Sequence, residues 1–354
     1  VGNLAQHTLG QDAAELVRVD YEPLPWVGDP EAALAPGAPL VHPDHGSNLF
    51  YRRIFTWGDV AGDFAKAGHQ LSVKLHWGRS ATVPIETFGV VANWDRGNDL
   101  LDVWASIQMP KYPDQMAQAL RLPLNAIRVH YDVDVGGSYG VKRGIKHSVL
   151  VGYLARKLNM PVRLIEDRLE NMVGGDMHGP DRRFDVTLAF DGDGLIRSMK
   201  LRALDDIGCY PGRSPLQLAK PVGAIVGPYR IASVEYEAIA VATNKTSQVA
   251  VRGFGQAPTN YALESAMDRV AAHLGMDRLA LRRRNFIQSH EFPYRIPSGS
   301  DYDSGDYAAV LDKTVALAKL EALTDRREAL RAEGRLAGIG FATCLEPSGG
   351  NAAF

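Results

Sequence analysis

The sequence predicts an α+β fold in which strands and helices follow one another without an internal repeat. Three observations predict this fold. Apolar and polar residues alternate over 70–77 and 88–95, a hairpin pattern occupies 184–204, and a strong helical periodicity runs over 258–274. The 354 residues, 45% hydrophobic and 23% charged, have an ordinary globular composition and are long enough for two or three domains.

Each predicted element follows from its local pattern. Alternation or short apolar runs predict strands at 16–21, 70–77, 88–95, 100–108, 126–131, 161–167, 184–190 and 195–204. Helical periodicity predicts helices at 112–122, 144–158, 258–274, 277–287 and 307–333. The stretch 26–62 is rich in Pro, Gly and Asp, so it is predicted to be a long connecting loop.

Charge and cysteine content exclude several classes of function. Lys and Arg total 39 against 41 Asp and Glu, so nothing favours a nucleic-acid partner, and no apolar run approaches the roughly 18 residues that cross a bilayer. Cys209 and Cys344 give neither a disulfide framework nor the four thiolates of an iron–sulfur cluster, and they fit a reducing, cytoplasmic setting. Both ends of the sequence read as interrupted elements, so we expect a piece of a longer protein.

A glycine-dense turn, DVGGSYG over 134–140, lies between the strand predicted at 126–131 and the helix predicted after Gly144. Its glycines allow positive φ and close approach to the backbone, and a helix start offers unpaired N–H groups to an anion. Lys142 and Arg143 add positive charge, so the turn predicts a site for an anionic or electron-rich ligand. The spacing matches neither a P-loop nor the dinucleotide-binding pattern, and a connection without a ligand stays open.

A second glycine turn, RGFG over 252–255, is predicted to lie between an alternating strand and the helix that begins near Pro258. Two such strand–glycine–helix units in one chain can converge on one ligand. Arg252 would then be a fixed donor for a carbonyl or carboxylate oxygen. For this arginine alone, a surface ion pair with a neighbouring acid is the alternative.

No pattern in the sequence predicts a metal ion held by side chains. The acidic turn 191–194 lacks the Glu of a calcium loop, because Arg202 stands at that position, and the ten histidines show no i, i+4 pair of a zinc helix. Glu170 and Glu264 are interpreted as structural acids.

Eight motifs carry a resemblance to a known family. They are, in chain order, DAAELVRVDYEPLP, VWASIQMP, DVGGSYGVK, VRLIEDRLENM, DDIGCY, VRGFGQ, NFIQSHEFPY and YDSGDY. Together they resemble the large, molybdenum-binding subunit of the xanthine oxidase and aldehyde oxidase family of molybdenum hydroxylases, near its bacterial branch related to aerobic carbon monoxide dehydrogenase. The resemblance implies that 1–45 is the end of a small α/β hammerhead domain and the start of a linker. It implies that 46–354 is the first molybdopterin-binding domain, of mixed sheets and helices, plus the start of a crossover to a second such domain.

The resemblance also implies site residues. Gln108 matches a glutamine that hydrogen-bonds an oxygen ligand of molybdenum, and Arg252 matches an arginine that orients the substrate or stabilises developing charge. The backbone of two turns is implied to approach the metal and the pterin, through Gly136, Gly137, Ser138, Tyr139 and Gly140 in the first and Arg252, Gly253, Phe254 and Gly255 in the second. Ser138 and Tyr139 depart from the family's Gly and Phe, which implies a more polar wall.

The implied cofactor is molybdopterin cytosine dinucleotide with molybdenum, while [2Fe-2S] clusters and FAD would sit on a small and a medium partner subunit. The implied assembly is a dimer of heterotrimers that oxidises a small organic substrate, an aldehyde or N-heterocycle, with oxygen from water. Carbon monoxide dehydrogenases carry a copper-bridging cysteine directly after the matching arginine, and Gly253 stands there instead, so we expect no carbon monoxide oxidation.

The family's general-base glutamate lies in a glycine-rich segment far downstream, and nothing in these residues matches it, so we expect the chain alone to be inactive. Two other interpretations stay open. One is a non-catalytic cofactor-binding or assembly module with the same fold. The other is a phosphate- or nucleotide-binding α/β enzyme without molybdenum, in which the two glycine turns act independently.

Overall fold

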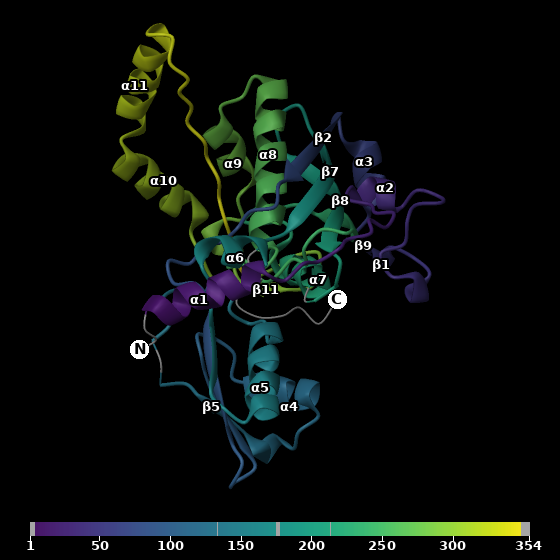
Figure 1. The fold of residues 1–354 in the computed structure, drawn as a ribbon. Coiled ribbons are helices and arrows are strands. Elements are labelled where there is room, and N and C mark those ends of the chain that lie inside the picture. The colour runs from purple at the N-terminus through teal and green to yellow at the C-terminus, as the bar shows by residue number, and fades with distance from the viewer. Residues whose placement is uncertain (1–3, 133, 175–177, 213, 348–354) are drawn as a thin grey trace.

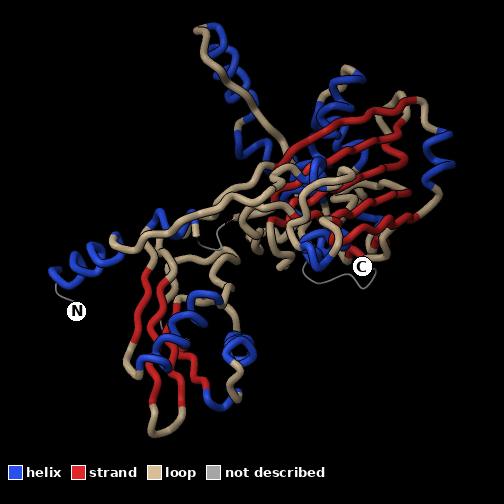
Figure 2. Tube along the Cα trace, turned by 45° about the vertical axis from the view of Figure 1, so that its right-hand side comes forward, coloured by secondary structure: helices blue, strands red, loops and turns tan. Residues whose placement is uncertain are grey.

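The computed structural model describes residues 4–132, 134–174, 178–212 and 214–347, which form two bodies, each built on its own mixed sheet (Figure 1). Figure 2 shows the two sheets as separate groups of strands, with loops and helices between and around them. The predicted α+β class is therefore confirmed.

The larger body is a five-stranded sheet in the order β1-β9-β8-β7-β2. Its strands are β1 (Leu49–Trp57), β9 (Ser233–Ala242), β8 (Ile196–Gly208), β7 (Asp181–Phe190) and β2 (His69–Trp77). Neighbouring strands are antiparallel except β8 and β9, which are parallel. Helix α8 (Gln256–Leu274) packs on β2 and β7, and α3 (Val60–Lys66) packs on β7, β8 and β9.

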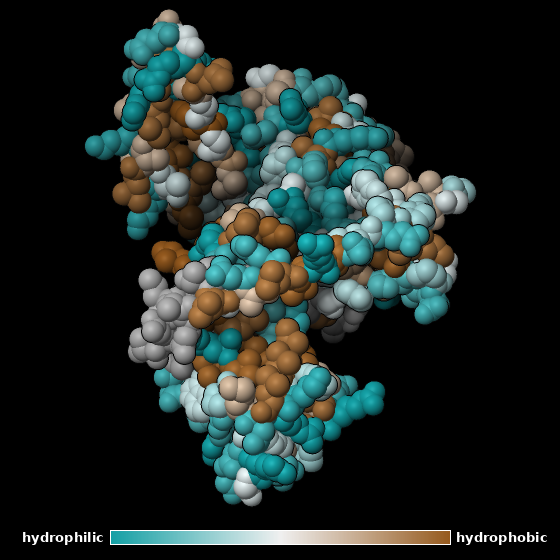
Figure 3. All heavy atoms as spheres, viewed as in Figure 1, coloured by the Kyte–Doolittle hydropathy of each residue, from teal (hydrophilic) through white to brown (hydrophobic). Residues whose placement is uncertain are grey.

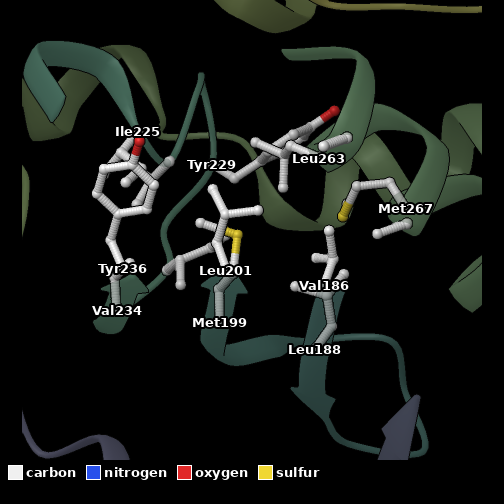
Figure 4. Close-up of a cluster of buried hydrophobic side chains, with 14 of the residues drawn as sticks. Val186, Leu188, Met199, Leu201, Ile225, Tyr229, Val234, Tyr236, Leu263 and Met267 are labelled. Atoms are coloured by element: carbon white, nitrogen blue, oxygen red, sulfur yellow. The ribbon is translucent and has the colours of Figure 1, made fainter. Parts of the chain in front are cut away.

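The core of the larger body lies between the sheet and α8. Figure 4 shows Val186 and Leu188 of β7 and Leu201 of β8 projecting toward Leu263 and Met267 of α8, and all five are buried. This burial is the main source of stability for the strands that reach toward the glycine turns.

The smaller body is a four-stranded sheet in the order β5-β4-β3-β6. Its strands are β5 (Ile127–His130), β4 (Leu100–Ala105), β3 (Gly89–Asp95) and β6 (Val162–Ile165). Helix α5 (Lys146–Leu158) packs on β3, β4 and β6, and α4 (Tyr112–Leu120) packs on β5 and α5. The sheet has a core of its own, which includes Val90, Leu101, Met116 and Val151.

The remaining elements connect or extend the two bodies. They are α1 (Leu4–Glu15), α2 (Pro30–Ala33), α6 (Arg168–Val173), α7 (Ser214–Ala219), α9 (Arg278–Asn285), β10 (Tyr294–Arg295), β11 (Asp301–Tyr302), α10 (Tyr307–Ala318) and α11 (Leu320–Ala332), with short 3-10 turns at 43–45, 124–126, 220–224 and 289–291. Figure 1 shows α10 and α11 projecting away from the larger body.

Helices α8 and α9 hold the irregular C-terminal segment through a buried acid. Glu264 accepts hydrogen bonds from Arg282 Nε at 2.9 Å, Tyr229 Oη at 2.5 Å and Thr343 N at 2.9 Å. Arg282 is fully buried and also pairs with Asp268. Glu170 fills the capping box of α6, so both acids interpreted as structural have structural contacts.

Two predictions near the N-terminus are wrong. Residues 16–21 form no strand, because no neighbouring strand in the described chain pairs with them. The predicted loop 26–62 contains β1, whose adjacent Arg52 and Arg53 interrupt the alternating pattern. An edge strand tolerates both residues: Arg52 pairs with Glu237, and Arg53 lies over the Phe55 ring.

Two further predictions need correction. The predicted helix 307–333 is two helices, because Lys319 adopts a left-handed conformation with φ of 50° between α10 and α11. The strand predicted before Arg252 is irregular backbone, since β9 ends at Ala242. On α5, Leu150 and Tyr153 are half exposed, and the buried face is formed by smaller residues such as Val151. The other predicted strands and helices are present with shifted ends.

Candidate cofactor site

The two glycine turns meet through a single backbone hydrogen bond. Arg252 N–H donates to the Tyr139 carbonyl oxygen at 2.7 Å. At Gly140 the backbones approach so closely that an added Cβ would lie 2.0 Å from the Ala250 carbonyl oxygen, and φ there is +111°. Only glycine fits this crossing without displacing the second segment. The predicted convergence of the two turns is therefore present.

Gln108, which lies shortly after the end of β4, joins the first turn. Its Oε1 accepts a hydrogen bond from Gly140 N at 3.0 Å and another from Ser138 Oγ. Ser138 Oγ in turn accepts from Lys142 N at 3.2 Å. The serine that departs from the family pattern therefore holds the Gln108 carboxamide by a contact that a glycine could not make.

A cavity of about 580 Å³ lies where these groups converge. Its lining includes seven of the predicted site residues: Gln108, Ser138, Tyr139, Gly140, Arg252, Gly253 and Phe254. It also includes Arg143, Lys220 and Glu346. The lining thus carries three cationic side chains and one carboxylate.

Three predicted residues lie beside the cavity and do not line it. Gly136 N–H donates to Glu86 Oε2 at 2.7 Å, and Gly137 has a φ of +94° that shapes the turn. Gly255 lies directly against the Gln217 carbonyl oxygen, where a Cβ would overlap it, and is the N-terminal cap of α8. These glycines shape the two turns.

The prediction that Lys142 adds positive charge to the ligand site is wrong. Its side chain is 3% exposed and its Nζ pairs with Glu86. Burial opposes ionisation of Glu86, but hydrogen bonds from Lys142, Gly136 N–H and Ser106 lower the pKa of that carboxyl below its usual value. This ion pair fastens the first turn to the segment before β3.

Lys220 and Glu346 were missed by sequence reasoning. Lys220 Nζ lies 2.5 Å from Glu346 Oε1, across 126 residues of sequence. Pro347, next to Glu346, packs over Gly223, where an added Cβ would lie 3.0 Å from it. Neither residue belongs to a motif, so only the folded chain reveals their place in the lining.

The backbone of the cavity suits an anionic or electron-rich group. Among the described residues, the N–H groups of Ser138, Tyr139 and Gly253 have no hydrogen-bond acceptor, and all three belong to residues that line the cavity. Unpaired backbone donors on glycine-rich turns are a common means of holding such groups. The residues present therefore fit a cofactor that presents phosphate oxygens or sulfur atoms as hydrogen-bond acceptors.

A second hollow, of about 1060 Å³, lies beside β6 and α6 and contains none of the predicted site residues. Leu169 and Val173 are exposed there. Figure 3 shows hydrophobic residues gathered on the face of the smaller body that is turned toward the viewer. In the part of the chain that the structure describes, no group of three His, Cys, Asp or Glu side chains could hold a metal ion, and no helix has the length and hydropathy to cross a membrane.

The fold and the cavity together define a cofactor-binding protein: two glycine turns, one before α5 of the smaller body and one before α8 of the larger, converge with a glutamine and an arginine on one polar hollow. Residues 41–286 match the model of the molybdopterin cofactor-binding domain. The chain belongs to this family, and its predicted identity as a large subunit of the molybdenum hydroxylases is confirmed.

Relatives of known function support the same assignment. The chain is 32% identical to the 6-hydroxypseudooxynicotine dehydrogenase complex subunit gamma of Paenarthrobacter nicotinovorans, over 96% of this chain and 43% of the relative. It is also 32% identical to the carbon monoxide dehydrogenase large chain of Hydrogenophaga pseudoflava, over 96% of this chain and 45% of the relative. The structure of quinoline 2-oxidoreductase from Pseudomonas putida 86 matches with a TM-score of 0.82 and 33% identity, covering 92% of this chain and 42% of that one. The chain thus spans less than half the length of these relatives.

Proposed function

We propose that this chain forms one side of the molybdenum cofactor site in a hydroxylase that oxidises an aldehyde, an N-heterocycle or a similar organic substrate. The observation that carries the proposal is the convergence of both glycine turns, Gln108 and Arg252 on one cavity. The bound cofactor would supply oxidation chemistry with water as the oxygen source. The chain by itself is expected to be inactive.

The residues have separate roles in this proposal. The unpaired N–H groups of Ser138, Tyr139 and Gly253 would bind the cofactor, and Gln108, fixed by Ser138, would donate its amide N–H groups toward it. Arg252 would orient a carbonyl or ring nitrogen of the substrate and stabilise negative charge that develops during the reaction. Its guanidinium has no hydrogen-bond or ion-pair partner in the described chain, so it is available for this contact.

The finer features of the proposal come from the family. They are molybdopterin cytosine dinucleotide as the form of the cofactor, an iron–sulfur subunit and an FAD subunit as partners, a dimer of heterotrimers, and a cytoplasmic location. The domain division at 45 and 46 is also part of the proposal, and the start of the family match at residue 41 supports it. Both cysteines are free, which supports a reducing compartment and leaves the clusters to other chains.

The proposed substrate class rests on the relatives and on one residue that departs from the carbon monoxide dehydrogenase pattern. Quinoline, named for the matching structure, is an N-heterocycle, and this supports a ring substrate. Carbon monoxide is disfavoured, although a carbon monoxide dehydrogenase is among the relatives, because Gly253 follows Arg252 where that branch carries a copper-bridging cysteine.

The test is to purify the whole complex that contains this chain and to measure molybdenum, the nucleotide released from the pterin, and turnover on a panel of aldehydes, N-heterocycles and carbon monoxide. Near-stoichiometric molybdenum with cytosine nucleotide and turnover of an organic substrate is the expected result. A complex that is matured correctly but lacks molybdenum would overturn the proposal and favour the non-catalytic module.

A further inference from the structure

The segment that carries Arg252 to the cavity is irregular backbone, although Gln248 and Ala250 within it are buried. From Gln248 to Arg252 it has no strand ladder, and separate hydrogen bonds hold it. Gln248 N donates to Ile207 O at 3.1 Å, Val249 N to His178 O at 2.9 Å, and Arg252 N to Tyr139 O at 2.7 Å. Isolated bonds constrain a backbone less than a ladder, so the placement of Arg252 depends on further contacts.

The side chain of Gln248 supplies two of these contacts. It is 1% exposed, and its Nε2 donates to Asp205 Oδ2 at 2.6 Å and also reaches Ser214 Oγ. Ser214 Oγ donates to the same carboxylate oxygen of Asp205. One buried oxygen therefore joins the cavity segment to the start of α7.

Asp205 is itself fixed by a buried charge. It stands directly opposite Arg182 in the antiparallel register of β7 and β8, and Arg182 Nε donates to Asp205 Oδ1 at 2.9 Å. Both side chains are fully buried. Burying such a pair is costly, and hydrophobic residues of similar volume often stabilise a core as well or better, so a gain in stability alone does not account for this pair.

Helix α7 provides a second connection to the same segment. Its Gln217 side chain is fully buried, and Nε2 donates to Val249 O at 3.3 Å. The Gln217 carbonyl oxygen packs against Gly255, at the far end of the second glycine turn. The segment is therefore held at Gln248, at Val249 and beyond Arg252 by contacts with residues of α7 and β8.

We infer that Asp205 and Gln248 are positioning residues. Through this buried network, the paired strands β7 and β8 set the position of the Gln248–Arg252 backbone, and thereby the position of the Arg252 guanidinium in the cavity. The inference rests on the proposed function for the role of Arg252. The placement of the backbone does not depend on that role.

The first measurement is hydrogen exchange on the whole complex carrying Gln248→Met, a change that keeps side-chain length and removes the amide. The amides of 249–254 are expected to exchange at least about tenfold faster, with other regions unchanged. Ser198→Ala is the control, because Ser198 is as buried as Gln248 and lies on β8, the strand of Asp205, but hydrogen-bonds to Ser233 at the opposite end of that strand. The control should leave exchange in 249–254 unchanged, and unchanged exchange in Gln248→Met would overturn the inference.

The second measurement is a double-mutant cycle with Arg252→Met, using kcat and KM normalised to molybdenum content. Gln248→Met alone is expected to lower kcat/KM about tenfold, since small displacements of an orienting group are costly. In the Arg252→Met background it should have almost no further effect, whereas a merely structural role would give additive losses that follow thermal stability. Full additivity would overturn the inference.

The two measurements also separate the inference from the proposed function. Wild-type kinetics in Arg252→Met would remove that residue from the proposed function, and the exchange data would still decide whether Gln248 positions the segment. Absence of molybdenum from the wild-type complex would likewise refute the proposed function alone. Ser214→Ala serves as a second variant should Gln248→Met fail to fold, with the same expected exchange in 249–254.

Discussion

Replacing Gly140 by alanine should disturb the crossing of the two turns and leave the rest of the fold in place. The new Cβ would lie 2.0 Å from the Ala250 carbonyl oxygen, whereas such contacts are essentially never below 3.0 Å, so Ala250 must move by about 1 Å. The positive φ of +111° costs about 1–3 kcal/mol for a residue other than glycine, and overpacking of this kind costs about 1–3 kcal/mol more. Because Ala250 leads directly to Arg252, the displacement moves the cavity wall.

The expected result is a several-fold loss of molybdenum in the purified complex, measured by elemental analysis alongside thermal unfolding. Gly275→Ala is the matched control, since Gly275 also has a positive φ, +63°, but has no heavy atom within 4 Å of an added Cβ. It should lower thermal stability and keep molybdenum. Normal molybdenum content in Gly140→Ala would refute the view that this crossing shapes the cofactor site.

Three further predictions concern single residues. In the whole complex, Gln108→Ala and Arg252→Ala should each lower kcat/KM about 10²-fold or more, as loss of a transition-state contact does. Their unfolding curves should stay close to wild type. Unchanged kinetics in both variants would contradict the roles proposed for these two residues. The pKa of Glu86 is lowered in the folded protein, so ionised Glu86 stabilises the fold above the ordinary pKa of 4.5, and this stabilisation is lost as pH falls through the folded-state pKa. Glu86→Gln should therefore make the stability of the protein depend less on pH in that range, measured by circular dichroism against pH. Glu264→Ala should destabilise the protein by about 3–5 kcal/mol, because it leaves the buried Arg282 short of a partner, and a loss below about 1 kcal/mol in denaturant titration would contradict that interpretation.

The meeting of the two turns could be predicted because clustered glycines indicate positive φ or close approach of another group to the backbone. DVGGSYG and RGFG each combine glycines with a following helix, and a sequence that shows neither a pattern of side-chain metal ligands nor a P-loop has few other uses for two such turns. The resemblance then placed Gln108 beside them. The structure brings Gln108, Gly140 and Arg252 to one cavity by means of hydrogen bonds that no spacing rule contains.

The features that sequence reasoning missed depend on distant partners. Lys142 looked like a free cation because Glu86, 56 residues earlier, gave no sign of pairing with it. Lys220 and Glu346 are brought together only when the C-terminal segment returns past α9. Residues 16–21 have a strand-like pattern, but a strand forms only where another strand completes its hydrogen bonds, which alternation alone does not reveal.

The projecting pair α10 and α11 is anchored where it leaves the body and where it returns. Leu311 packs at its base, Arg278 and Arg282 donate to the carbonyl oxygens of Ile339 and Phe341 on the returning chain, and α11 buries none of its own residues. With both ends fixed, the outer part of this pair can change in length without moving the cavity wall at Glu346. The open turn at Gly334, which has no heavy atom within 4 Å of an added Cβ, is therefore a suitable place to insert a fluorescent label or an affinity tag into a working complex.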